Sequence, residues 1–388
     1  MNLEQARRRW NGKQNTGADF RTVPGGWSRA LGGVDPYLAL HARDATVSRE
    51  DIDGAMAQDE IWVVPGVRGC IWLVPKADVP LALRVSDAQS RKRSLRELDK
   101  LGVPAAELEA LGSAVLDTLA AGPKGPSELR KALPEGSWRS LGDAGKKKGH
   151  TTSLPTALRL LEWDGKIRRR QDNGRLDTNR YAWELAAINT LTPSPAVDDP
   201  DAALAQRFLS WCGPATLEEF VEWSALGKRA AKAAFERLNA ATIDLEGQTA
   251  YQLTADEPPE DDDVYLLPAQ DNMVTLHHPS KLLDPRHQTL EMPSMGNKIV
   301  QIGTSRWVFQ RPVFHRGQWI GLWAWDFDAA EIILRGFDPL DGEVKAKAEA
   351  KAHDMASFIT DQLGGRAKAN SIDGDKSQRA RAACVRAI

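Results

Sequence analysis

Basic side chains gather in one stretch of this sequence, and their spacing suits the binding of phosphate groups. Residues 121–185 contain 14 Lys and Arg against 8 Asp and Glu, a local excess of six positive charges. Two runs hold much of this excess, Lys146–Lys148 and Lys166–Arg170. If about six of these cations met DNA phosphates, counterion release would give a log–log salt slope of roughly −5. For an isolated run, a solvated charged surface is the alternative interpretation.

Residues 205–253 have the element order of a winged helix, which is a helix-turn-helix followed by a β-hairpin. Apolar residues at helical spacing predict a first helix, and the Gly-Pro pair at 213–214 ends it. Thr216 followed by Glu219 is a capping box that predicts the start of a second helix. This order of elements indicates a partner made of duplex DNA.

A third helix with a basic outer face is expected at about Lys228–Ala240. Lys228 and Arg229 lie on that outer face, as in a recognition helix that reads the major groove. Alternating runs at 243–245 and 251–253 flank a short turn and predict the hairpin of the wing. The unit is then complete.

The same order of elements recurs at 108–185, interrupted by an insertion at Gly136–Thr152. Its expected parts are helices at Leu108–Ala121, Pro126–Ala132 and Thr156–Trp163, then strands IRRR and RYAWEL joined at Asn173-Gly174. A third copy is expected near the N-terminus. Its parts are helices at Leu3–Arg9, Leu38–Ala45 and Arg49–Ala57, then a hairpin IWVVPGVRGCIWLVP that turns at Pro65-Gly66.

The pattern changes to β after two seams, Thr190–Pro200 and Ala255–Asp263, which are rich in proline and acid and are expected to be exposed linkers. The runs VYLLP, MVTLHH, KIVQIG, RWVFQRPVFHR and QWIGLWAW predict an antiparallel sheet or barrel. A closing helix is expected at Val344–Leu363, and a mobile tail after it. The predicted class is therefore α+β, with regions 1–100, 101–190, 201–254, 264–363 and 364–388.

Composition excludes several classes of protein. No apolar run approaches the roughly 18 residues of a membrane span, and the N-terminus lacks the apolar region of a signal peptide. The three cysteines, Cys70, Cys212 and Cys384, have no metal-site spacing and are expected to be buried thiols. We therefore expect a cytoplasmic monomer whose cysteines do not form a metal site. The net charge of −2 makes the distribution of charge more informative than its sum.

Several short elements occur in a fixed order along the chain. They are EQARRRW, GGVDPYLALHAR, VRGCIWLVP, GPATLEEFVEW, LLPAQDN, LLDP and RGQWIGLWAW. Together they resemble the AlkZ/YcaQ family of winged-helix DNA glycosylases, over about residues 3–360. The resemblance implies three winged helices in a C-shaped arrangement on a β-rich C-terminal scaffold, with a basic channel for double-stranded DNA. It also implies hydrolysis of the N-glycosidic bond of N7-alkylated or crosslinked purines without a cofactor.

The catalytic motif of characterised members, Gln-x-Gln or Gln-x-Asp, is absent here. The corresponding stretch, Gly32–Tyr37, places Asp35 and Tyr37 at the two motif positions. A carboxylate at Asp35 would orient water and offset positive charge on the sugar. Its alternative role is a helix N-cap, since Pro36 follows it. Tyr37 would either stack on a sugar or base or pack in the core.

The resemblance and the basic runs together indicate a set of DNA-binding residues. Arg68 matches an arginine of the family's Arg-Gly-Thr element, and the insertion is expected to be either a basic loop that reaches DNA or a disordered surface loop. Asp271 matches an aspartate of the Leu-Leu-Pro-x-x-Asp element and is expected to pair with an arginine. The candidate contacts are Arg43, Arg68, Lys146, Lys147, Lys148, His150, Arg168, Arg169, Arg170, Lys228 and Arg229.

Three functions are compatible with these patterns. The first is a glycosylase in which Asp35 is the acting group. The second is a noncatalytic DNA-binding protein, either a damage sensor or a transcriptional regulator, that keeps the channel without the glutamines. The third is a protein-interaction module built from the same helices. The position of Asp35 relative to the basic residues is the observation that separates the first from the others.

Overall fold

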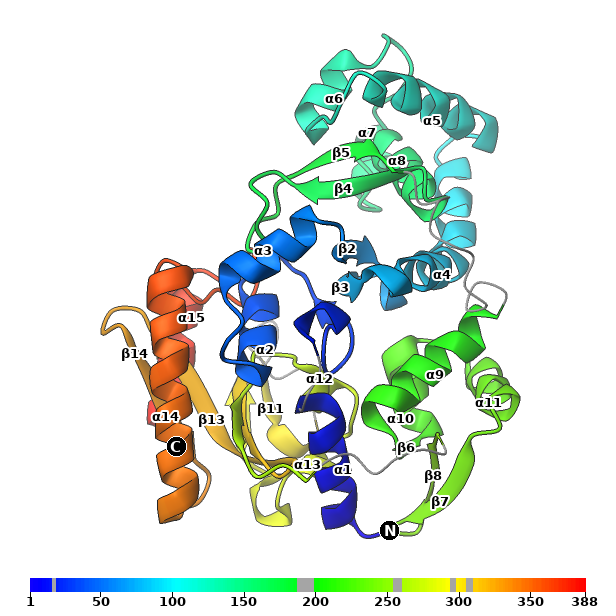
Figure 1. The fold of residues 1–388 in the computed structure, drawn as a ribbon. Coiled ribbons are helices and arrows are strands. Elements are labelled where there is room, and N and C mark those ends of the chain that lie inside the picture. The colour runs from blue at the N-terminus through cyan, green and yellow to red at the C-terminus, as the bar shows by residue number, and fades with distance from the viewer. Residues whose placement is uncertain (16–18, 187–198, 254–259, 294–297, 305–309) are drawn as a thin grey trace.

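The computed structural model describes residues 1–15, 19–186, 199–253, 260–293, 298–304 and 310–388. Helices and strands are mixed along the whole chain. Figure 1 shows two units of helices with a hairpin, one around β4 and β5 and one around β7 and β8. Between them lie the N-terminal helices, with the C-terminal sheet and its helices α14 and α15 beside them. None of the described helices is long and apolar enough to cross a membrane.

The N-terminal part consists of four helices around a small sheet. In this sheet β1 pairs with β3, and β3 pairs with β2. A 3-10 turn at Val67–Gly69 joins β2 to β3, so the expected hairpin is present with a longer connection than the predicted Pro65-Gly66 turn. The elements are α1 (Leu3–Asn15), β1 (Ser28–Arg29), α2 (Asp35–Arg43), α3 (Arg49–Ala57), β2 (Ile61–Pro65), β3 (Ile71–Pro75) and α4 (Val79–Asp99).

The second unit contains four helices and one hairpin. The inserted residues 136–152 are ordered, because the short helix α7 lies within them and Ser140 bridges Thr152 at their base. The alternative of a disordered surface loop is therefore wrong. The elements are α5 (Ala105–Leu119), α6 (Pro126–Ala132), α7 (Gly142–Lys146), α8 (Leu154–Trp163), β4 (Ile167–Gln171) and β5 (Tyr181–Leu185).

The third unit has the element order expected from its sequence. The predicted capping box is confirmed, since Thr216 and Glu219 bond to each other's backbone at the start of α10. Glu246 and Gly247 both have positive φ, which is what a two-residue hairpin turn requires. The elements are α9 (Pro200–Cys212), β6 (Ala215–Thr216), α10 (Leu217–Ser224), α11 (Lys228–Arg237), β7 (Ala241–Leu245) and β8 (Gln248–Gln252).

The C-terminal part is built on a four-stranded antiparallel sheet of order β14-β13-β12-β9. The expected strand MVTLHH is wrong: it forms α12, because Asp271 accepts from the Met273 N–H and starts a helix. The first part of RWVFQ lies outside the described residues. The elements are β9 (Val264–Leu266), α12 (Asn272–Thr275), α13 (Pro279–Leu282), β10 (Glu291–Pro293), β11 (Ile299–Gln301), β12 (Arg311–His315), β13 (Gln318–Asp326), β14 (Glu331–Gly336), α14 (Gly342–Ser357) and α15 (Asp375–Arg386).

The expected mobile tail at 364–388 is also wrong, because its last residues form α15. This helix lies against β13 and β14 and buries Ala382 and Val385. Arg379 forms an ion pair with Asp328 at 2.7 Å and Arg386 pairs with Asp326. The tail is poor in large apolar residues, so its sequence gave little sign of a buried face.

The acid run before β9 pairs with basic side chains instead of facing solvent alone. Asp262 accepts from Lys347 at 2.7 Å and also from Arg316, and Asp263 pairs with Lys351 at 2.7 Å. These bonds tie the start of β9 to α14. Most of the two predicted linkers, residues 190–198 and 255–259, lies outside the described residues.

Tyr37 is a buried residue whose hydroxyl links α2, α3 and the connection between β4 and β5 by hydrogen bonds. Its side chain is fully buried in α2. The hydroxyl donates to Asp53 of α3 and accepts from the backbone N–H of Leu176, in the connection between β4 and β5, at 2.8 Å. The packing alternative for Tyr37 is therefore confirmed. A role in stacking on a sugar or base is wrong, because no face of the ring is exposed.

We expect Tyr37→Phe to lower the free energy of unfolding by about 1–3 kcal/mol, because Asp53 and the Leu176 N–H would lose a buried partner. Chemical denaturation followed by circular dichroism measures this change. Tyr181→Phe is the control, since Tyr181 is half-buried with its ring packed edge-on against Trp183. Equal stability of Tyr37→Phe and the wild type would contradict the assignment.

Candidate active site

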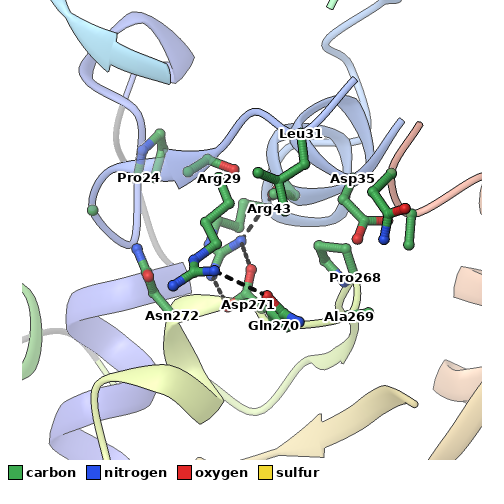
Figure 2. A pocket seen from close by; sticks show the side chains of 15 residues that line it. Pro24, Arg29, Leu31, Asp35, Arg43, Pro268, Ala269, Gln270, Asp271 and Asn272 are labelled. Atoms are coloured by element: carbon green, nitrogen blue, oxygen red, sulfur yellow. Dashed lines mark hydrogen bonds and ion pairs between the residues drawn. The ribbon is translucent and has the colours of Figure 1, made fainter. Parts of the chain in front are cut away.

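A small pocket lies beside α2, between the loop that carries Pro24 and β1 and the loop 268–272 that follows β9. Figure 2 shows Asp35, Arg29, Arg43 and Gln270 around it. Its inner part has room for one or two water molecules, because the space open to water-sized occupants is about 30 Å³. The C-terminal residues Ala369 and Asn370 complete the lining.

Asp35 faces this pocket from the first turn of α2. Val34 precedes the helix as its cap residue, and no side chain caps that end, so the N-cap alternative for Asp35 is wrong. The carboxylate instead accepts a hydrogen bond from Arg311 Nη2 at 3.2 Å, a residue of β12 that is distant in sequence. Pro36 occupies an early position of the helix, where its missing N–H costs nothing.

Burial controls the ionisation of Asp35. Loss of water around the carboxylate raises its pKa, and this outweighs the attraction of Arg311 and Arg381, while Asp373 raises it further. The resulting pKa is about 7. Burial also lowers the pKa of Arg311, but a guanidinium remains charged at any physiological pH. Asp35 is therefore divided between its protonated and ionised forms near neutral pH, which suits a general base.

Arg43 and Asp271 form a buried ion pair across the pocket from Asp35. Two parallel hydrogen bonds of 2.9 and 2.8 Å join them, as Figure 2 shows. Their side chains are 3% and 4% exposed. The expected pairing of Asp271 with an arginine is confirmed. The expected DNA contact of Arg43 is wrong in this structure, because its guanidinium is enclosed and also donates to Gln14 and Ala39 carbonyls.

Two residues of the pocket were not singled out from the sequence. Arg29 lies over the ring of Trp72, 5.2 Å from its centre, and donates to Gln270 at 3.4 Å. Burial lowers the pKa of Arg29. Gln270 has a φ of +61°, which is unusual for a residue other than glycine and turns the loop toward the pocket. The sequence pointed to Gln270 only through its position in the family-like element LLPAQDN.

Arg68 lies in the connection between β2 and β3, with its backbone at a φ of +62°. Its side chain donates to the carbonyl of Glu222 in α10 at 2.6 Å. It lines a second pocket together with Arg29 and Trp72. The structure therefore brings Arg68 near the candidate site, as part of the contact between the first hairpin and the third unit.

The run Arg168–Arg170 is matched by carboxylates. Arg168 pairs with Asp59 at 2.7 Å and with Glu184 at 2.5 Å, and Arg169 pairs with Glu162 at 2.6 Å. Arg170 uses the same two carboxylates as Arg168. The side chains of Arg168 and Arg169 are 14% and 16% exposed and already paired, so their role as phosphate contacts stays a prediction. They hold β4 to β5, to α8 and to the end of α3.

The remaining basic candidates lie in separate units, and all of them except His150 are exposed. Lys146, Lys147 and Lys148 stand at the end of α7, where Lys146 pairs with Asp143 at 3.3 Å. His150 is half-buried and contacts Glu97 at 3.3 Å. Lys228 and Arg229 begin α11 in the third unit, and Lys228 pairs with Glu218 at 3.1 Å.

The described residues contain no group of three or more His, Cys, Asp or Glu side chains that would hold a metal ion. Polar groups that line the pocket include Asp35, Arg29 and the amides of Gln270, Asn272 and Asn370. A carboxylate of raised pKa that faces a water-sized space is suited to activating water.

Comparison with known proteins agrees with these features. The sequence profile described as DNA glycosylase AlkZ-like matches residues 34–358. Among solved structures, the Streptomyces sahachiroi DNA glycosylase AlkZ is similar in fold, with a TM-score of 0.68 and 16% sequence identity, over 93% of this chain and 97% of that one. A search of curated protein sequences gave no match. Because the profile matches most of the chain, this protein belongs to the AlkZ-like family of DNA glycosylases.

Proposed function

We propose that this protein is a monofunctional glycosylase that hydrolyses the N-glycosidic bond of N7-alkylated or crosslinked purines in duplex DNA. The observation that carries the proposal is the position of Asp35. It faces a pocket from α2, and its pKa is raised to about 7. Membership of a DNA glycosylase family supports the reaction class.

The reaction needs one activated water and a stabilised sugar cation. An N7-alkylated purine carries a positive charge, so it leaves readily with the electrons of the bond from C1′ to N9. Ionised Asp35 offsets the charge that develops on the sugar and takes a proton from water. The water oxygen forms the new bond to C1′, and the proton passes from Asp35 to solvent. The products are the free base and an abasic site.

The arrangement of the units supports duplex DNA as the substrate. We propose that α1–β3, α5–β5 and α9–β8 are three winged helices, each with a hairpin as its wing. Exposed lysines at the end of α7 and exposed cations at the start of α11 would contact phosphates from two different units. Such contacts give affinity and fix the register of the DNA without reading its sequence.

A noncatalytic damage sensor or transcriptional regulator is the second candidate. It is favoured by one observation: Tyr37, at the second motif position, is fully buried and cannot touch DNA. A protein that binds alkylated duplexes tightly without releasing the base would have this function. The two candidates share the DNA-binding surface and differ only at Asp35.

The wild-type protein is expected to release 7-methylguanine from duplex DNA, seen as strand breaks after alkali treatment. Asp35→Asn removes the base and is expected to slow release by about 100-fold or more, with DNA affinity nearly unchanged. Asp117→Asn is the matched control, because Asp117 is exposed on α5 and distant from the pocket in the sequence. No release from several alkylated duplexes by the wild type, together with tight binding, would select the second candidate.

The rate of base release is expected to rise with pH and to level off above about pH 7. The sign follows from the role of the carboxylate, since only the ionised form accepts a proton and its fraction grows as pH passes the pKa of Asp35, about 7. Single-turnover rates between pH 5.5 and 9 measure the midpoint. A flat profile, or one that falls over this range, would exclude Asp35 as the base.

Replacing Lys146, Lys147 and Lys148 together by Gln is expected to weaken duplex binding for every sequence tested. Each lost phosphate contact lowers the steepness of the log–log salt dependence by about 1, so the triple variant should lose up to about 3. Fluorescence anisotropy at several salt concentrations measures this. Lys345→Gln, an exposed lysine of α14, is the control and should leave the slope unchanged. An unchanged slope for the triple variant would remove α7 from the interface.

A further inference from the structure

The C-terminal segment 366–374 lies across the N-terminal end of α2. The Val34 N–H donates to the Lys368 carbonyl at 2.7 Å, and the Ser371 N–H donates to the Leu31 carbonyl at 3.1 Å. A Cβ at Gly33 would collide with the backbone of Lys368 and Ala369, so only glycine permits this close approach. The segment lies outside residues 34–358, which the family profile matches.

The same segment also holds the partner of Asp35. Arg311 Nη2 donates to the Ala367 carbonyl at 2.6 Å as well as to Asp35 at 3.2 Å. The guanidinium lies over Trp323, 4.8 Å from the centre of the ring. Arg311 is thus held between a carbonyl of the segment, an aromatic face and Asp35.

Asn370 brings a polar side chain from the segment into the lining of the pocket that contains Asp35. Its Oδ1 accepts from the Ile372 N–H at 3.0 Å, which fixes the orientation of the amide. The amide nitrogen carries two N–H groups that can donate to a further partner. Two other amides line this pocket: Asn272 donates to the carbonyls of Gly25 and Trp27, and Gln270 accepts from Arg29.

We infer that the C-terminal segment is part of the active site, and that Asn370 acts with Asp35 to hold the attacking water. This inference rests on the proposed glycosylase function. The amide of Asn370 donates to the water oxygen, while Asp35 accepts a proton from the same water. Asn370 then supplies the second polar contact that Tyr37 does not.

Two buried residues, Asp373 and Arg381, hold the C-terminal segment in position. Asp373 accepts from the Ala369 N–H at 2.8 Å and from Arg381 Nη2 at 3.0 Å. Arg381 belongs to α15, which is itself held on the sheet by the ion pair between Arg379 and Asp328. Asp373 and Arg381 therefore act on Asp35 through the backbone at 367–370 and through their charges.

The charges that face Asp35 come from three elements. Arg311 of β12 and Arg381 of α15 favour its ionised form, and Asp373 opposes it. The mutually paired Arg43 and Asp271 line the other side of the pocket. Neutralising Asp373 should therefore lower the pKa of Asp35, whereas neutralising Arg381 should raise it.

The first test is Asn370→Ala, measured by single-turnover release of 7-methylguanine. We expect a rate about 10-fold to 100-fold lower with unchanged duplex affinity, the loss typical of one positioned hydrogen-bond donor. Lys376→Ala, an exposed residue of the same C-terminal region, is the control and should release base at the wild-type rate. A wild-type rate in Asn370→Ala, alongside a large loss in Asp35→Asn, would overturn the inference and leave the proposed function standing.

The second test compares Asp373→Asn with Arg381→Gln. The midpoint of the pH–rate profile should move to lower pH in the first variant and to higher pH in the second. The ¹³C signal of the Asp35 carboxyl, titrated in labelled protein, should shift in the same two directions and needs no activity. If Asp373 and Arg381 only held the segment in place, the midpoint of the pH–rate profile would move in the same direction in both variants. That result would overturn the inference. Absence of base release by the wild type would overturn the proposed function, and the inference with it.

Discussion

The site depends on how α2 is held, because both of its ends are tied by carboxylate–arginine pairs to the C-terminal half of the chain. At its C-terminal end, Arg43 makes two hydrogen bonds to Asp271. At its N-terminal end, Asp35 accepts from Arg311. Removing one partner of the Arg43–Asp271 pair would leave an unpaired buried charge, which is strongly destabilising. The helix therefore has little freedom to shift relative to the loop 268–272, and the pocket between them keeps its shape.

These two pairs differ in geometry, and the difference sets their chemistry. Arg43 and Asp271 make a planar, two-bond contact that is nearly sealed from water. Asp35 has one bond to Arg311, and Arg311 divides its donors between Asp35 and the Ala367 carbonyl. The negative charge of Asp35 is therefore less fully balanced by hydrogen bonds and positive charge, and burial raises its pKa to about 7. The first pair is suited to structure and the second to proton transfer.

The apolar cores explain why the units keep their places around this helix. One core joins α1, α2 and α3 to the C-terminal sheet, through residues such as Trp10, Leu38 and Trp323. A second joins the first hairpin and α4 to the third unit, through Trp72, Leu83 and Phe220. A third core fills the unit at α5–β5. This core includes Leu98 of α4, and further contacts with the first unit come from the polar bonds of Tyr37 and the ion pairs of Arg168.

The sequence by itself determined the local elements and the family. Capping residues such as Thr216 and Glu219 act within one helical turn, so their role was readable without a structure. The ordered elements from GGVDPYLALHAR to RGQWIGLWAW identified an AlkZ-like chain, which the family profile confirms. Asp271 was expected to pair with an arginine, although its partner was not named.

Only the tertiary structure decided which polar residues are available for chemistry. The run Arg168–Arg170 and the tyrosine at position 37 have the composition of a binding site, yet the fold places carboxylates or backbone groups against them. Asp35 has the sequence context of a helix cap, yet its partner Arg311 lies 276 positions away. Asn370 comes from a tail that looked mobile. Solvation and pairing depend on contacts between segments distant in sequence, and residue type and spacing along the chain do not contain that information.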